Sequence, residues 1–187
     1  MNTKYVIEHL DDKLYDWSIL EYQHASKMVG KKNILFTNIK KSDIKKLKIY
    51  GEVTTKSVLE LNLKNACLLD PKAKRILSPK DKFDYYIFGG ILGNHPMDGR
   101  TDKELGQIKV QKRNLGQEQM STNTAVIVTK RIIDGRKFSD LKFKDTLEID
   151  LGDNFSNILP YRYLVENKKV VLPPKFKSFL KKQEDNM

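Results

Sequence analysis

The first candidate for chemistry is a glycine-rich segment that directly follows an apolar run: Phe88-Gly89-Gly90-Ile91-Leu92-Gly93-Asn94-His95-Pro96. Three glycines within five residues allow positive φ and let the backbone approach a ligand closely. The segment is not a Walker loop, because no Gly-Lys-Ser/Thr follows, and it lies too far along the chain for the first turn of a Rossmann fold. Taken alone, the segment is equally typical of a tight glycine turn.

The second candidate is a glycine loop between a strand-like run and a helical pattern: Arg113-Asn114-Leu115-Gly116-Gln117-Glu118-Gln119-Met120-Ser121-Thr122. Ser121 or Thr122 can act as the N-cap of the helix that follows. The free backbone amides at such a helix start can bind polar or anionic groups. By itself, this pattern is also that of an ordinary connection between a strand and a helix.

These two loops belong to a chain in which apolar runs alternate with helical periodicity. The runs predict strands at 4–8, 33–36, 65–69, 84–88 and 108–112. The helical patterns cover 16–29, 101–107 and 122–134, and a shorter one ends near residue 63 after a lysine-rich stretch. This alternation predicts an α/β fold with a mainly parallel sheet and helices on both faces. Ligands bind such sheets at the carboxyl ends of the strands, which makes the loops after the third, fourth and fifth strands the expected site.

The chain beyond residue 136 has a different pattern, with short strand-like runs, three prolines and a final helical pattern. No flexible linker or internal repeat separates it from the rest. We therefore expect one domain over residues 1–187, with 136–187 packed on it as a C-terminal extension.

The composition restricts the possible partners and the cellular compartment. A formal net charge of +11 over 187 residues favours anionic partners such as RNA or ribosomes, although a lysine-rich proteome explains it equally well. The single cysteine, Cys67, excludes an internal disulfide and a cysteine zinc site, and its apolar neighbours suggest a buried strand thiol. The amino terminus lacks signal-peptide features, and no apolar run is long enough to cross a bilayer. We expect a cytoplasmic protein without membrane contact.

Several further motifs accompany the two loops in a fixed order. They are YVIEH at 5–9, WSILEY at 17–22, CLLDP at 67–71, PYRYL at 160–164 and LP at 172–173. From about residue 4 to 174 the chain resembles the knotted SPOUT methyltransferases. Within them it is most similar to the SPOUT-domain protein arginine methyltransferases of eukaryotes and their archaeal relatives. The chain departs from that family's usual pattern in having Asn94 and Asn123 in place of aspartates, and Met97-Asp98 in place of Pro-Arg.

The resemblance implies a SPOUT-like fold with a C-terminal trefoil knot and S-adenosylmethionine as the cofactor, without a metal. Backbone groups of the knotted loops would hold the cofactor, and Met120 and Leu92 would contact the adenine. The implied cofactor-binding residues are Leu69, Gly89, Gly90, Leu92, Gly93, Asn94, Leu115, Gly116, Gln119, Met120, Ser121 and Thr122. The family's kind of substrate would be an arginine in a basic protein of the small ribosomal subunit.

An arginine substrate also requires carboxylates, because its guanidinium stays protonated and must be oriented. The candidates for this catalytic role are Glu8, Glu21 and Asp98. Glu21 lies on or beside the apolar face of its helix, four residues after Trp17, and is equally consistent with a surface glutamate. Among the histidines, His24 is expected to be a core residue, whereas His9 and His95 fall within the family motifs.

Two other functions remain open from the sequence. Most SPOUT enzymes methylate RNA as dimers, and the +11 charge suits RNA, but no separate RNA-binding module is visible. A non-catalytic ribosome-binding protein that keeps the knot is the second alternative. Because the extension from residue 136 could cover the dimerisation face of other SPOUT proteins, we expect a monomer, with a homodimer as the alternative.

Overall fold

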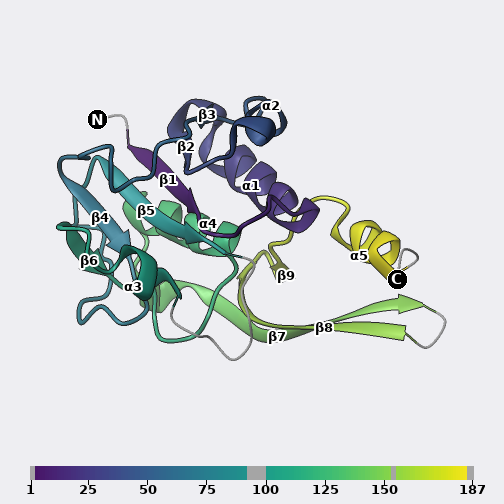
Figure 1. The fold of residues 1–187 in the computed structure, drawn as a ribbon. Coiled ribbons are helices and arrows are strands. Elements are labelled where there is room, and N and C mark those ends of the chain that lie inside the picture. The colour runs from purple at the N-terminus through teal and green to yellow at the C-terminus, as the bar shows by residue number, and fades with distance from the viewer. Residues whose placement is uncertain (1–2, 92–99, 153–154, 185–187) are drawn as a thin grey trace.

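A six-stranded parallel sheet forms the centre of the computed structural model, which describes residues 3–91, 100–152 and 155–184 (Figure 1). Across the sheet, the strands are β3 (Glu52–Val53), β2 (Ile34–Thr37), β1 (Lys4–His9), β5 (Tyr85–Gly90), β4 (Ala66–Leu69) and β6 (Gln111–Arg113). Each neighbouring pair is parallel. The α/β class and the mainly parallel sheet are as the sequence predicts.

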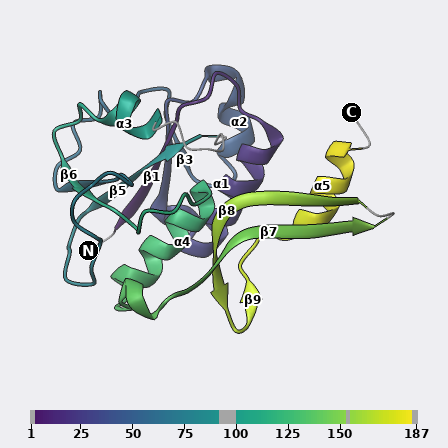
Figure 2. The ribbon, with the colours of Figure 1, turned by 90° about the horizontal axis from the view of Figure 1, so that it is seen from below.

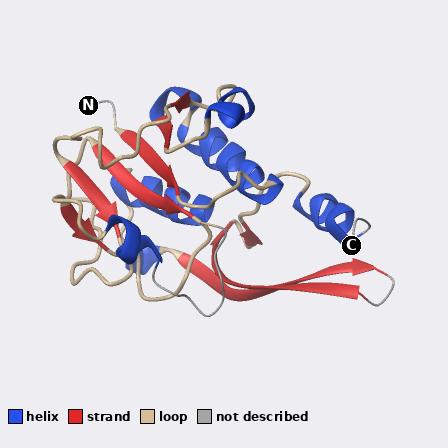
Figure 3. Ribbon diagram, in the orientation of Figure 1, coloured by secondary structure: helices blue, strands red, loops and turns tan. Residues whose placement is uncertain are grey.

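Helices cover both faces of this sheet (Figure 3). On one face, α1 (Asp16–Val29) and α4 (Thr122–Ile133) pack against each other and against the strands, and on the other face lies α3 (Arg100–Leu105). Since central parallel strands are buried on both faces, they are apolar at successive positions rather than alternate ones. In β1, for example, Tyr5 and Ile7 join the core under α1 and α4, whereas Val6 joins the core under α3.

Helix α1 has the bounds that its periodicity predicts, 16–29. It ends at Gly30, which has a φ of 91°, a conformation that favours glycine. Helix α4 likewise follows its predicted N-cap, Ser121, although the Ser121 side chain makes no capping hydrogen bond to the helix. Cys67 is fully buried in β4, as expected, and burial raises the pKa of its thiol to about 12.

The prediction of a helix ending near residue 63 is wrong. Residues 57–62 form consecutive turns, in which Glu60 N donates to Ser57 O and the Glu60 carboxylate accepts from Ser57 N. The lysine-rich stretch before it contains helical turns instead, η2 (Lys41–Asp43) and α2 (Ile44–Leu47). A further turn, η1 (Lys31–Asn33), connects α1 to β2. A short helix is marginal without tertiary support, so local turn bonds decide such segments.

The strand-like runs after residue 136 join into a long antiparallel hairpin, β7 (Lys142–Gly152) and β8 (Phe155–Glu166), which projects beyond the sheet (Figure 2). A short η3 (Phe138–Asp140) precedes it, and β9 (Lys169–Val170) and α5 (Phe176–Glu184) follow. Trp17 of α1 packs edge-on against Phe176 and Phe179 of α5, with ring centroids 5.3 Å and 5.8 Å apart. These aromatic contacts attach the C-terminal segment to the sheet layer. None of the described helices is long and apolar enough to cross a membrane.

Candidate active site

The carboxyl ends of β5, β4 and β6 lie side by side, because β4 is placed between the other two strands. The loops that follow these three strands are the polar, glycine-bearing loops that the sequence singles out. Ligands of parallel α/β sheets bind at this edge, since the backbone groups of several loops converge there. The strand order therefore gathers the predicted loops at one position of the molecule.

The loop between β6 and α4 is held from both sides. At its start, Leu77 N donates to Asn114 O at 2.9 Å, and near its end Arg162 N of β8 donates to Gln119 O at 2.7 Å. Gly116 within it has a φ of 89°, which an L side chain rarely adopts. The hairpin thus helps to fix the backbone of this loop, which also includes the predicted residue Leu115.

Glu21 lies at the start of α4, next to this loop. Its carboxylate accepts hydrogen bonds from Trp17 Nε1 at 2.9 Å and from Thr122 N at 3.2 Å. The side chain is 8% exposed. A carboxylate at a helix amino terminus is stabilised by the free amides and the helix dipole. The structure therefore brings one predicted catalytic carboxylate directly against the predicted cofactor loop.

Burial raises the pKa of Glu21 to about 7, and the hydrogen bonds from Trp17 and Thr122 oppose that rise. At this pKa the group can be either charged or protonated near neutral pH. Two tyrosines of β8 lie close enough for the Glu21 charge to raise their pKa values further, after the larger effect of burial: Tyr161 and Tyr163. Tyr163 is buried in the core, whereas Tyr161 is only partly buried. A carboxylate of raised pKa therefore lies near a partly buried aromatic ring, an arrangement that suits a cation with a flat apolar surface.

The sequence does not predict that these tyrosines lie near Glu21. They lie within the PYRYL motif, but nothing in the spacing places that motif near Glu21, which is about 140 residues earlier in the chain. Trp17 is partly buried and packs against the core through its contacts with α5. Its indole N–H also donates the hydrogen bond that fixes the Glu21 carboxylate.

A second buried network lies beside Glu21, between α1 and α4. Asn123 Nδ2 donates to His24 Nδ1 at 2.9 Å, so the His24 proton resides on Nε2, and Ser121 Oγ donates to Asn123 Oδ1 at 2.8 Å. Burial first, and Lys27 second, lower the pKa of His24 to about 4. His24 is therefore the neutral core histidine that the sequence predicts.

This network predicts how the stability of the protein depends on pH. Because the folded state holds His24 neutral, its contribution to stability is present above the unfolded pKa of 6.5 and is lost as the pH falls toward about 4. Asn123→Asp would place a carboxylate beside the imidazole and raise its pKa, so the variant should lose less stability than the parent protein over this interval. Thermal melts of both proteins between pH 4 and 7 measure the difference. An equal loss of stability in the two proteins as the pH falls would contradict the prediction.

Glu8 lies on the other face of the sheet. Its carboxylate accepts hydrogen bonds from the Thr37 hydroxyl, from Ser57 Oγ at 2.5 Å and from Val58 N at 2.9 Å. The side chain is 1% exposed. These contacts tie the end of β1 to β2 and to the turn at 57–58, and they account for the burial of Glu8 without a catalytic role. The structure does not bring Glu8 and Glu21 together.

The two described glycines of the first loop are required by packing rather than by positive φ, contrary to expectation. A Cβ on Gly90 would overlap the Tyr22 hydroxyl and lie 2.7 Å from Ile7 Cγ2. A Cβ on Gly89 would lie 2.5 Å from Thr101 Oγ1. The absence of a Cβ at these two positions therefore leaves room for the protein's own side chains on both faces of β5.

The Tyr22 hydroxyl beside Gly90 is itself fixed by a histidine. Because His9 Nε2 donates to Lys13 O at 3.1 Å, its Nδ1 is the acceptor for the Tyr22 hydroxyl at 2.9 Å. Burial lowers the pKa of His9 and favours this neutral form. His9 thus braces the end of β1.

The remaining predicted residues divide into two groups. Leu69 and Ser121 are buried, Met120 packs against the core under α1 and α4, and Gln119 and Thr122 provide the backbone contacts described above. Leu92, Gly93, Asn94, His95 and Asp98 lie outside the described residues. The cofactor-binding and catalytic roles assigned to individual residues remain predictions.

Comparison with known proteins gives one family. A family model described as protein arginine N-methyltransferase SFM1-like matches residues 4–187. Protein arginine N-methyltransferase SFM1 of Saccharomyces cerevisiae is 38% identical to this chain over 202 aligned positions, which cover 96% of this chain and 94% of the relative.

Solved structures agree with this assignment. The yeast arginine methyltransferase SFM1 complexed with S-adenosylmethionine superposes with a TM-score of 0.88 at 35% identity, covering 99% of this chain and 92% of that one. Its complex with S-adenosylhomocysteine gives a TM-score of 0.86 at 36% identity, covering 95% and 94%. Dual-specific Trm10 from Thermococcus kodakaraensis gives 0.61 at 18% identity, covering 74% and 96%, and thus shares the fold. The resemblance in the motifs is confirmed, and this chain belongs to the SFM1-like family of protein arginine N-methyltransferases.

Proposed function

We propose that this chain transfers a methyl group from S-adenosylmethionine to an arginine side chain of a protein. The methyltransferase activity and the cofactor are confirmed predictions, since the yeast relative is an arginine methyltransferase that crystallises with S-adenosylmethionine and S-adenosylhomocysteine. The structural observation that carries the proposal is the buried Glu21 carboxylate against the amino terminus of α4, where the predicted cofactor loop ends.

In the reaction, a guanidinium nitrogen attacks the methyl group in line with the carbon–sulfur bond. That bond breaks, its electron pair stays on sulfur as S-adenosylhomocysteine forms, and the nitrogen loses one proton. Ionised Glu21 orients the guanidinium by charge-assisted hydrogen bonds, and its pKa of about 7 lets it accept the departing proton. The partly buried ring of Tyr161 would supply an aromatic wall that helps to exclude water.

The substrate we propose is a basic protein of the small ribosomal subunit. A chain with a net charge of +11 needs a local surface on which a basic partner can dock. Residues 145–161 contain four acidic residues and no lysine or arginine. Asp145 is paired with Arg162, so Glu148 and Asp150 are the described carboxylates that would meet a partner. We call the part of the hairpin that this stretch forms the acidic arm.

One end of the acidic arm lies at the candidate active site, because Tyr161 is close to Glu21. The outer parts of β7 and β8 extend from there away from the sheet (Figure 1). On one face of the arm, Glu148 lies opposite Ile158, which is 63% exposed, and Asp150 lies opposite Ser156. A surface with carboxylates around an exposed apolar side chain fits a segment in which basic and apolar residues mix.

Reversing the charge of this face should weaken protein binding without affecting the cofactor. For Glu148→Lys with Asp150→Lys, we expect the KM for small-subunit proteins to rise about tenfold at low salt, with the KM for S-adenosylmethionine unchanged. Steady-state methyl transfer at two salt concentrations measures both constants. Each single reversal, Glu148→Lys or Asp150→Lys, is compared with Asp140→Lys on η3, which makes the same change in charge outside the arm. An equal change in KM for this control would argue against the arm.

The experiment that tests the proposed function uses methyl-labelled S-adenosylmethionine and small ribosomal subunits that lack their own methylation. Label in one small basic protein, recovered as methylarginine, is the expected result. Label in RNA would support the alternative of an RNA methyltransferase, which the net charge of +11 favours. Absence of label with the cofactor still bound would favour a non-catalytic ribosome-associated protein or another substrate.

We also propose the trefoil knot and a cytoplasmic monomer. In support of the knot, the chain after β6 pairs with the segment after β4, since Asn114 N donates to Arg75 O at 2.8 Å and Leu77 N donates to Asn114 O. The Arg162 contact with the same loop supports the monomer, because it places the C-terminal segment where a partner subunit could otherwise pack. Sedimentation equilibrium tests the monomer, for which one chain mass is the expected result.

A further inference from the structure

Arg162 of β8 is the residue through which the hairpin reaches the loop between β6 and α4. Its backbone N donates to Gln119 O at 2.7 Å, and it forms an isolated parallel bridge with Met120. These contacts use only the backbone, so that any residue type except proline could make them. The presence of an arginine side chain at this position therefore needs a separate explanation.

The guanidinium group of Arg162 is held in one orientation by two residues of β7. It makes a bidentate ion pair with Asp145, in which Nη2 and Oδ2 are 2.7 Å apart, and its Cζ lies 5.3 Å from the centroid of the Phe143 ring. Phe143 in turn packs against Phe138, with ring centroids 5.3 Å apart. A planar guanidinium can form a fork with a carboxylate while it lies on an aromatic ring, which an ammonium group cannot do.

The loop between β6 and α4 lies against this group of side chains. A Cβ built on Gly116 would lie 3.0 Å from Phe138 Cζ and 3.8 Å from Arg162 Nη1. The hydrogen-bonded Asp145 carboxylate raises the pKa of Arg162, and the charge of Glu118 in the loop adds to this rise, so Glu118 is also close to the guanidinium. The side chain of Arg162 thus supports the glycine part of the loop, whereas its backbone contacts the part that leads into α4.

We propose that Arg162 is a positioning residue for the cofactor. Its backbone fixes one part of the predicted cofactor loop and its side chain fixes the other, so that the backbone groups of the loop are oriented before S-adenosylmethionine binds. A loop that is already ordered loses less conformational entropy on binding, which increases the affinity. Because Asp145 belongs to the acidic arm, the same side chain also connects the arm to the cofactor loop. The proposal rests on the cofactor-binding part of the proposed function, and not on the nature of the methyl acceptor.

The test is calorimetric titration of the full chain with S-adenosylhomocysteine, together with thermal melts of the free protein. Arg162→Ala should raise the dissociation constant by about tenfold, because the ligand must then order the loop. Arg162→Lys should also bind more weakly than the parent protein, since it keeps the charge and the backbone contact but loses the planar fork. This second variant keeps the test decisive if the alanine variant does not fold.

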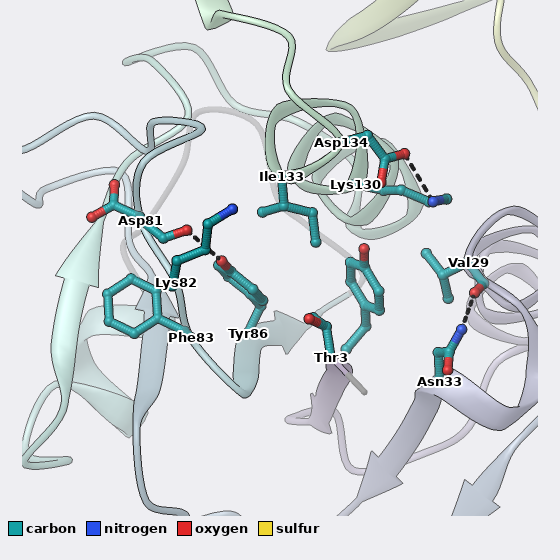
Figure 4. A pocket seen from close by; sticks show the side chains of 11 residues that line it. Thr3, Val29, Asn33, Asp81, Lys82, Phe83, Tyr86, Lys130, Ile133 and Asp134 are labelled. Atoms are coloured by element: carbon teal, nitrogen blue, oxygen red, sulfur yellow. Dashed lines mark hydrogen bonds and ion pairs between the residues drawn. The ribbon is translucent and has the colours of Figure 1, made fainter. Parts of the chain in front are cut away.

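Arg131→Ala is the matched control. Arg131 of α4 makes an equally bidentate pair with Glu166 of β8, at 2.7 Å and 2.9 Å, and its side chain is 21% exposed, compared with 20% for Arg162. It lies in the last turn of α4, whereas the cofactor loop precedes the first turn. This last turn borders a hollow at the amino ends of β1 and β5, where Lys130 pairs with Asp134 (Figure 4). The control should lower the melting temperature but leave the dissociation constant unchanged.

The outcomes separate positioning of the loop from general stability. An unchanged dissociation constant for Arg162→Ala would overturn the proposal, and so would an equal rise for Arg131→Ala. Binding by Arg162→Lys at the parent affinity would refute positioning by the planar group, because charge alone would then be enough. The titration does not depend on the methyl acceptor, so failure of this proposal is distinguishable from failure of the proposed transfer to arginine.

Discussion

Replacing Glu21 with glutamine is expected to lower kcat for arginine methylation by about a hundredfold or more. The substitution keeps the size of the side chain and an oxygen that can accept from Trp17 Nε1, but it removes the negative charge. A guanidinium in the site would then lose both its orienting ion pair and the acceptor for its proton. The KM for S-adenosylmethionine should change little, because the loop beside Glu21 is also held by Arg162 and Leu77.

The pH dependence of kcat/KM separates this role from a structural one, because this quantity reports the ionisation of the free protein. Since burial raises the pKa of Glu21 to about 7, kcat/KM of the parent protein should rise as the pH increases through about 7, where the carboxylate becomes charged. Glu21→Gln should lose this limb of the profile. Asp16→Asn removes an exposed carboxylate from the same helix and is the matched control. If Glu21→Gln retained the parent kcat and pH profile, the catalytic role would be refuted.

Replacing Gly90 with alanine is expected to destabilise the protein by about 3 kcal/mol or more. The new methyl group would overlap the Tyr22 hydroxyl and lie 2.7 Å from Ile7 Cγ2, so that β1, β5 or α1 would have to move. Both neighbours are fully buried, and the Tyr22 hydroxyl is fixed by His9, which leaves little room for relaxation. Chemical denaturation, followed by circular dichroism, measures the loss.

A second substitution tests the cause of this loss. Gly90→Ala combined with Tyr22→Phe should recover part of the stability, because the overlapping oxygen is gone while the contact with Ile7 remains. Gly135→Ala is a useful comparison, since its Cβ would meet no atom within 4 Å and only its φ of 111° opposes a side chain. We expect a loss of about 1–2 kcal/mol there. If Gly90→Ala cost no more than Gly135→Ala, the close packing would not be what requires glycine.

The proposed docking role of the acidic arm would account for how a basic chain modifies a basic partner. The positive charge is spread over the molecule, whereas the stretch 145–161 contains only acidic ionisable side chains and a tyrosine. Because charges separated by more than about 8 Å are largely screened at physiological salt, the local charge of the arm decides close contacts with a partner. The general positive charge would then act on RNA around the substrate.

The sequence by itself determined the local structure and the family. The periodicity of residues 16–29 predicted the bounds of α1, because the spacing of apolar residues is a property of the segment alone. The continuous apolar runs at β1, β4 and β5 indicated strands buried on both faces for the same reason. The motifs of the two loops identified the family and the cofactor, since they preserve the residue types that the loops require.

Only the tertiary structure decided which residues meet. Glu21 and Thr122 are 101 residues apart, and their contact depends on α1 packing beside α4. Glu8 stands in an equally promising motif, but alternate directions along β1 turn it to the opposite face, where Ser57 and Val58 satisfy it. The placement of β4 between β5 and β6 is likewise a property of the whole sheet. Local patterns specify which side chains are buried, whereas the order of the strands specifies their partners, and that order depends on the free energy of the complete fold.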